Sequence, residues 1–128
     1  PDSYNITFFG QSVQLKDTFR EVNMAIFIVL GTYSNKGADG LINGQSDRRA
    51  AMETLTSSVG AKLLDYHITR GLYDFCLTTE ADNFDQIAAM NLKAKAAGTV
   101  GTLDVLEAVS IDHIREISKT VEFLPPKV

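Results

Sequence analysis

Two ionisable side chains interrupt a largely apolar pair of segments that is typical of a β-hairpin. His67 lies within residues 62–68 and Asp74 lies within residues 72–79. A carboxylate in such a strand is costly unless that face of the strand is polar or the group has a function. Because a histidine beside a carboxylate can act as a general base, we predict His67 and Asp74 as candidate catalytic residues.

The two-residue alternation of a strand sorts the side chains of this hairpin onto two faces. One set is predicted to face a layer of helices: Leu64, Tyr66, Ile68, Tyr73, Phe75 and Leu77. The other set is predicted to lie on an uncovered face: Leu63, Asp65, His67, Leu72, Asp74, Cys76 and Thr78, joined by Thr102 and Asp104 if Leu103 and Val105 are in the core. We predict that a small-molecule ligand would contact Asp65, Tyr66, Tyr33, Cys76, Asp104 and Arg70.

A structural interpretation of the same residues stays open. His67 and Asp74 are also what the wetter side of a half-exposed sheet contains, and Asp74 can accept hydrogen bonds from Arg70 or from turn amides. Cys76, as a lone thiol in a strand, is typical of a small buried hydrophobe. Since no His, Cys or carboxylate pair has the spacing of a known metal site, we expect no metal and no cofactor.

Composition excludes several classes of protein. The 128 residues predict one domain, and the single cysteine cannot form an internal disulfide. The net charge of −4 and the lack of a basic cluster argue against nucleic acid as a partner. The adjacent pair Arg48-Arg49 favours a solvated helix face, with a grip on an anionic ligand as the alternative. Without a long apolar run we expect no membrane span and a cytoplasmic location.

The order of predicted elements is that of an α+β protein. Residues 25–33, 62–68, 72–79 and 99–109 have the composition of strands, and Ser34 to Gly40 has that of a turn. Helices are predicted after Ser46, after Asp82 and, near the C-terminus, after Ser110. We predict a ferredoxin-like βαββαβ fold, in which a four-stranded antiparallel sheet carries two helices on one face, with an extra helix at the C-terminal end. The chain then divides into an N-terminal arm (1–23) with a short helix around 14–20, a domain (24–118) and a C-terminal tail (119–128).

The stretch Gly71-Leu-Tyr-Asp74 resembles the signature of the GYD-domain family. Tyr33 with the Gly37 loop, Arg49 and residues 60–63 extend this resemblance from about Met24 to Ile117. The resemblance implies a ferredoxin-like domain that pairs sheet to sheet into a dimeric α/β barrel, and it implies little about chemistry. The arm is a departure from the typical short family member.

Three functions are compatible with this pattern. The first is a homo-oligomer, most simply a homodimer, that binds a small organic molecule between facing sheets. The second is a cofactor-free enzyme of the isomerase or monooxygenase type that uses His67 and Asp74 for proton transfer. The third is a structural or assembly subunit whose open face is filled by a partner and whose arm mediates contacts.

Overall fold

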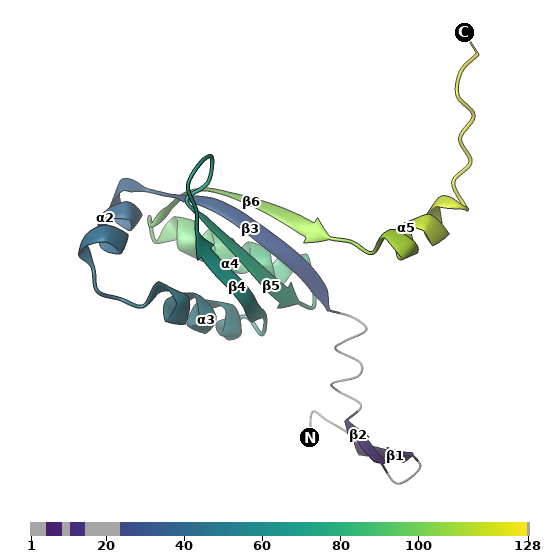
Figure 1. Cartoon of the computed structure of the whole chain (residues 1–128), viewed down its shortest axis with the longest axis horizontal. Helices are drawn as coiled ribbons and strands as arrows, with labels where there is room; N and C mark the ends of the chain where they lie inside the picture. Colours follow the sequence, from purple (N-terminus) through teal and green to yellow (C-terminus); the bar gives the residue numbers. More distant parts are fainter. Residues whose placement is uncertain (1–4, 9–10, 15–23, 128) are drawn as a thin grey trace.

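The structure is a computed structural model that describes residues 5–8, 11–14 and 24–127. Four antiparallel strands form an open sheet, and helices pack on one of its faces (Figure 1). The α+β class is therefore confirmed. The described elements are β1 (Asn5–Phe8), β2 (Gln11–Gln14), β3 (Ala25–Tyr33), α2 (Asn35–Asn43), α3 (Arg48–Ser58), β4 (Lys62–Ile68), β5 (Phe75–Ala81), α4 (Phe84–Ala96), β6 (Val100–Ala108) and α5 (Ile111–Ser118).

The sheet has the strand order β4-β5-β3-β6, so β3 and β5 are the two central strands. Their pairing joins Phe27 to Thr79 and Val29 to Leu77. Alternation then directs Phe27, Val29, Phe75 and Leu77 toward the helices, where they are buried. Gly31 faces the ring of Phe75, and a Cβ there would collide with the ring edge. The close approach of β3 and β5 at this point therefore requires glycine.

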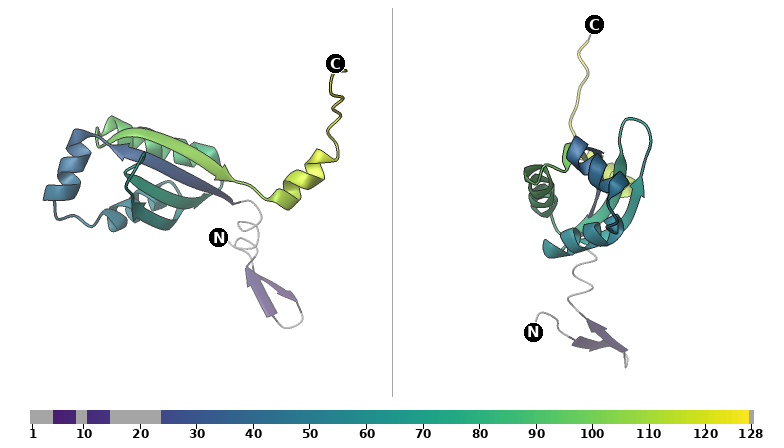
Figure 2. Two further views of the ribbon diagram at one scale, coloured as in Figure 1. Left: turned by 45° about the horizontal axis from the view of Figure 1, so that its top comes forward. Right: turned by 90° about the vertical axis from the view of Figure 1, so that its left-hand side faces the viewer.

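Helices α3 and α4 cover the same face of the sheet (Figure 2). From α4, Ile87 and Met90 are buried against the strands, and α3 adds Met52 and Leu55 at three-residue spacing. Burial of this apolar surface holds the two layers together. We refer below to this side of the sheet as the helix face and to the opposite side as the open face.

Two helices have their N-cap one residue later than we predicted. Asp47 rather than Ser46 accepts the first-turn N–H in α3, from Ala50. Asn83 rather than Asp82 caps α4 and forms a capping box with Gln86. The prediction that Ser110 caps the last helix is confirmed.

The segment predicted as a turn after the first strand of the sheet is instead a helix. Ser34 accepts the N–H of Gly37 at 3.1 Å and so caps α2. Gly37 is buried against the backbone of Thr99, where any Cβ would clash. The prediction was wrong because it weighed the glycines as helix breakers, whereas here glycine permits contact between α2 and the chain before β6.

The predicted arm and tail differ in how much of them is described. β1 and β2 pair with each other in a separate two-stranded sheet. The helix predicted around residues 14–20 falls outside the described residues, except for Gln14 at the end of β2. At the other end, α5 continues beyond β6 and does not cover the sheet (Figure 1), and the described residues that follow it, up to Lys127, have no regular structure.

Candidate functional site

The residues predicted to bind a ligand divide between the two faces of the sheet. Asp65, His67, Cys76 and Asp104 lie on the open face, on β4, β5 and β6. Tyr33 and Tyr66 pack against the core on the helix face. Arg70 and Asp74 lie in the connection between β4 and β5 rather than in a strand. The predicted residues therefore do not form one site.

Cross-strand register gathers the open-face group. His67 is opposite Cys76, which is opposite Leu30, which in turn is opposite Asp104. The next row places Asp65 opposite Thr78. The prediction from alternation that these polar side chains share a face is confirmed for Asp65, His67, Cys76 and Asp104. It does not hold for Asp74, which lies before β5 with its carboxylate on the Tyr33 N–H.

A hydrogen bond joins His67 Nε2 to Asp65 Oδ2 at 2.9 Å. Both side chains are more than half exposed. The bond to His67 lowers the pKa of Asp65 below its ordinary range, because a donated hydrogen bond favours the charged carboxylate. The carboxylate that orients His67 is therefore Asp65.

A bulge in β4 corrects the predicted placement of two leucines. The register shifts between Leu63 and Asp65, so that Leu64 is an extra residue in the pairing with β5. As a result Leu63 packs against the core and Leu64 is exposed, the reverse of what strict alternation predicts. Beyond the bulge, Tyr66 on the helix face and His67 on the open face follow the prediction.

Tyr73 was predicted to face the helices, and that prediction was wrong. Its hydroxyl donates a hydrogen bond to Asp104 Oδ2 at 2.9 Å, and Asp104 is on the open face. The bond to this carboxylate raises the pKa of Tyr73, since loss of the proton would place two negative charges together. Because β5 begins at Phe75, alternation does not extend back to Tyr73.

Asp74 makes backbone contacts that connect the hairpin to β3. Its carboxylate accepts the N–H of Tyr33 at 2.8 Å, and its own N–H donates to the carbonyl of Gly31 at 2.8 Å. Its carbonyl accepts the N–H of Thr69, which closes the connection between β4 and β5. These contacts give the carboxylate a structural partner at the point where the pairing of β3 with β6 shifts register.

An uncovered aliphatic stripe runs along the middle of the open face. Ile26, Ile28 and Leu30 alternate along β3 with the buried residues of the helix face. Leu106 of β6 is directly opposite Ile28 and is 53% exposed. We call these four residues the open-face stripe.

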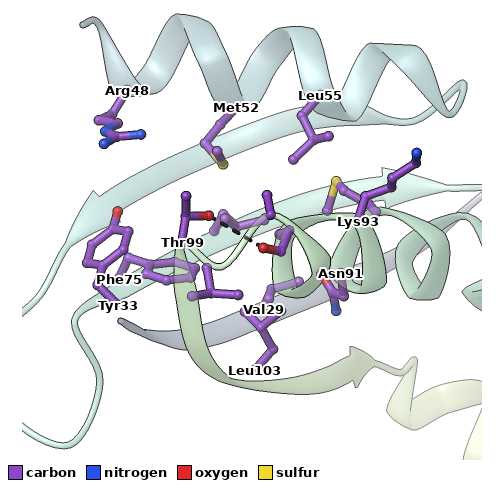
Figure 3. Close-up of a pocket in the computed structure, with 15 residues that line it drawn as sticks. Val29, Tyr33, Arg48, Met52, Leu55, Phe75, Asn91, Lys93, Thr99 and Leu103 are labelled. Atoms are coloured by element: carbon purple, nitrogen blue, oxygen red, sulfur yellow. Dashed lines mark hydrogen bonds between the residues drawn. The ribbon is translucent and has the colours of Figure 1, made fainter. Parts of the chain in front are cut away.

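A cavity of about 230 Å³ lies between the sheet and helices α3 and α4 (Figure 3). Its walls are mostly apolar, with Val29, Phe75 and Leu103 on the sheet and Met52 and Leu55 on α3. Arg48 and Tyr33 lie at one end, and Lys93 and Asn91 lie at the other (Figure 3). The described residues that line this cavity include two cations and no carboxylate.

Two tyrosines form a hydrogen-bonded pair at the Arg48 end of the cavity. The hydroxyl groups of Tyr33 and Tyr66 are 2.8 Å apart, and the Tyr33 ring packs on Phe75 with centroids 4.9 Å apart. Burial raises the pKa of Tyr33 above its ordinary value, and the bond to Tyr66 raises it further. Both predicted ligand-binding tyrosines therefore present hydroxyl groups on the helix face rather than on the open face.

Arg48 is another residue that our sequence reasoning misplaced. It does not lie on a solvated helix face, because its Nε atom is fully buried and has no hydrogen-bond partner among the described residues. Its neighbour Arg49 is exposed and pairs with Glu53. The signal was present in the sequence, since Arg48 precedes Met52 and Leu55 by four and seven residues and so shares their helix face.

Metal ligation and membrane insertion have no support in the described part of the chain. No group of three or more His, Cys, Asp or Glu side chains is positioned there to hold a metal ion. Among the described helices, none has both the length and the apolar character that a membrane crossing requires.

Comparison with known proteins identifies related sequences. A family model described as the GYD domain matches residues 27–118. The chain is also similar to a protein of Thermus thermophilus named "Glutamine synthetase and cystathionine beta-lyase binding protein". The two sequences are 28% identical over 88 residues, which cover 69% of this chain and 92% of the relative.

Proposed function

Because this chain belongs to the GYD-domain family, we propose that it is a binding protein that associates with other protein chains through the open face of its sheet. The observation that carries this proposal is the open-face stripe of Ile26, Ile28, Leu30 and Leu106. The Thermus thermophilus relative supports the protein-binding part, since its name describes binding to two enzymes.

The open-face stripe has the composition of an interface core. Aliphatic side chains that stay in water forgo the stabilisation of burial, about 25 cal/mol for each Å² of apolar surface. The polar side chains Asp65, His67 and Glu80 flank the stripe on β4 and β5. An apolar centre with a polar rim is how protein–protein interfaces are arranged.

Helix α5 offers a second surface that the protomer leaves uncovered. Ile111, Ile114 and Ile117 recur at three-residue spacing along it, and all three are exposed. Phe123 and Leu124 in the following segment are exposed as well. A helix with an apolar side needs a surface to bury it, and in this chain α5 projects away from the sheet (Figure 1).

The occupant that we propose for the open face is a second copy of this chain. The two-fold pairing of identical faces would bury the stripe against itself, and α5 of each copy would extend toward the other. Such a homodimer would also enclose His67 and Asp65 between two sheets. That space is where a small organic ligand would bind under the first function predicted from the sequence.

Solution mass tests this proposal. Leu106→Asp places a charge in the stripe at a site that is exposed in the protomer, so folding should be retained while association is lost. We expect the wild type to have the mass of a dimer and the variant to have the 14.0 kDa mass of one chain in native mass spectrometry. The matched control is Ile42→Asp on α2, at an equally aliphatic but 78% exposed position outside the open face. A monomeric wild type, or a variant with unchanged mass, would refute the proposed interface.

The two enzymes named for the relative are the first heterologous partners to test. Purified glutamine synthetase and purified cystathionine beta-lyase would each be titrated with wild-type protein and with Leu106→Asp. Binding that Leu106→Asp weakens would mean that partner docking requires the open face, either directly or through the homodimer that it forms. Equal binding by both proteins would exclude that face.

Proton transfer is a second candidate function, favoured by the 2.9 Å contact between His67 and Asp65. The imidazole would act as the base, and Asp65 rather than Asp74 would orient it. Asp74, whose carboxylate accepts the Tyr33 N–H, would support the fold. Exchange of the α-proton of an enolisable acid in deuterated water should then require His67 and tolerate Asp74→Asn. Exchange at the same rate in His67→Gln would reject this candidate.

A further inference from the structure

The helix-face cavity combines an apolar interior with an unsatisfied cation. Arg48 enters it from the first turn of α3, and its Nε atom is buried without a hydrogen-bond partner among the described residues. Buried polar groups in proteins are nearly always hydrogen-bonded. Arg48 as a whole is half-buried, so the group that lacks an acceptor is its buried Nε–H. The Nε–H of Arg48 therefore lacks the hydrogen-bond acceptor that its burial requires, and a ligand in the cavity could supply one.

The guanidinium is also held in place. A Cβ on Gly40 of α2 would lie 2.7 Å from Arg48 Nη2, so the guanidinium lies against the backbone of α2. The hydroxyl of Tyr33, which lines the same end of the cavity, is bonded to Tyr66 at 2.8 Å (Figure 3). A planar cation beside a hydroxyl is suited to an oxyanion, because the guanidinium fork matches the two oxygens of a carboxylate.

The remaining walls define the body of the ligand. An apolar cavity of about 150 Å³ is sufficient to bind benzene, and this one measures about 230 Å³. Its side walls come from Met52, Leu55, Val29 and Leu103, whose side chains offer no hydrogen-bond donor and only the weak acceptor of a thioether. The ligand must therefore be apolar along most of its length and no larger than a substituted aromatic ring.

We propose that the helix-face cavity is a binding site for a small organic acid, whose carboxylate pairs with Arg48 and whose aromatic or branched aliphatic body fills the space between α3 and α4. The net charge of the chain is −4, yet the described cavity residues carry only positive charge. The local field therefore selects an anion that the protein as a whole would repel. This site lies on the opposite side of the sheet from the proposed interface, so it holds or fails independently of the self-association.

Titration with 3-phenylpropionate tests the proposal, with its uncharged amide as the matched probe. The readout is the Nε–H resonance of Arg48 in nitrogen-15 NMR spectra of the full chain, together with calorimetric affinity. We expect the acid to shift that resonance. The amide should bind at least about tenfold more weakly, which is the usual cost of losing a charge-assisted hydrogen bond.

Three variants locate the site. Arg48→Met keeps the length of the side chain without its charge and should lose affinity by about tenfold or more. The matched control is Arg49→Met, whose parent side chain pairs with Glu53 outside the cavity and which should bind like the wild type. Ala94→Phe fills the cavity from α4 and should abolish binding while Arg48 stays in place. Dispersed amide spectra establish that each variant is folded.

Several results would overturn the assignment. Equal affinity for the acid and the amide would remove the role of charge. Equal losses of affinity in Arg48→Met and Arg49→Met would mean that the acid responds to the net charge of the protein and not to Arg48. If neither 3-phenylpropionate nor the smaller benzoate moves the Arg48 resonance at millimolar concentration, the cavity is not a site for acids of this class.

Discussion

The two faces of this sheet are built on the same strands but differ in what covers them. On the helix face, α3 and α4 of the same chain bury Phe27, Val29, Phe75 and Leu77 and leave a cavity with a cationic end. On the open face, Ile26, Ile28, Leu30 and Leu106 are partly or largely in water, beside the His67–Asp65 pair. One face is completed within the protomer and the other is not. The contrast predicts that a substitution on the helix face changes stability, whereas one on the open face changes association.

The largest expected effect comes from Phe27 and Ile28, which are consecutive residues of β3 on opposite faces. Phe27 is 3% exposed and its ring lies 6.0 Å from that of Phe84. We expect Phe27→Ala to lower the free energy of unfolding by about 3–5 kcal/mol at every protein concentration. Ile28→Ala should instead destabilise in a concentration-dependent way, because its effect acts through association.

Urea unfolding of both variants at two protein concentrations measures this difference. The stability of each variant is compared with that of the wild type at the same concentration. A Phe27→Ala loss that changes with concentration, or an Ile28→Ala loss that is large and independent of it, would mean that the faces do not divide in this way.

The next effect concerns Asp74. Asp74→Ala removes the acceptor of the part-buried Tyr33 N–H. An amide left without a partner costs about 1–3 kcal/mol, whereas Asp74→Asn keeps an acceptor oxygen and should cost less. Urea midpoints of the two variants give the comparison. A fully stable Asp74→Ala would remove the structural role and return Asp74 to the list of catalytic candidates.

The tyrosine pair of the helix face should show a smaller effect, one that depends on pH. The pKa of Tyr33 is raised in the folded state, so its neutral form is favoured by folding. Stability from this group is present below the ordinary value of 10.0 and is lost as the pH rises above it, because the unfolded chain then releases the proton first. We expect Tyr33→Phe to lower stability by about 0.5–1.5 kcal/mol at neutral pH and to flatten the decline above pH 10.

Ultraviolet absorbance of tyrosinate during alkaline titration provides the measurement. The matched control is Tyr4→Phe, in a part of the sequence remote from this pair. A Tyr33 with a raised pKa does not ionise while the protein is folded, so Tyr33→Phe should leave the tyrosinate curve unchanged in that range. Loss of a tyrosinate step near pH 10 in Tyr33→Phe would contradict the raised pKa.

The smallest effect is expected at the exposed pair of the open face. His67 lowers the pKa of Asp65, so His67→Ala should return that pKa toward its ordinary value of 3.8. A lowered pKa adds stability above the ordinary value and loses it as the pH falls through the folded-state value. Carboxyl carbon-13 shifts of Asp65 followed from pH 6 to pH 2 report the change. An Asp65 titration that is the same with and without His67 would remove the hydrogen bond from the solution structure.

Prediction from sequence succeeded where a local pattern was sufficient. The boundaries of β3 and β4 agree with the predicted segments 25–33 and 62–68, because β-branched and aromatic residues there alternate over a full strand. The left-handed conformation of Gly60, with φ of 78°, ends α3 as such glycines do. The uncovered face and its polar residues followed from the same alternation.

Prediction failed where the outcome depended on contacts between distant segments. Alternation continued unchanged would place Leu63 on the open face, and only the pairing of β4 with β5 reveals the bulge. From the sequence, Asp74 is a strand residue with an unexplained charge. In the structure its carboxylate accepts a hydrogen bond from the N–H of Tyr33, 41 residues earlier. Arg48 looked like a surface residue because its cavity is formed by segments that precede and follow it by up to 55 residues.

The sequence by itself determined the four strand segments of the sheet, three of the helices, the family signature and the division of the sheet into an apolar and a mixed face. These features depend on interactions between residues close together in the chain, so the spacing of residue types in the sequence indicates them. Only the tertiary structure decided that Tyr33 meets Tyr66, that His67 is paired with Asp65 rather than with Asp74, and that Arg48 lies at the end of a cavity. Cross-strand register and the gap between two helices are set by the packing of the whole core, and residue spacing alone does not determine either.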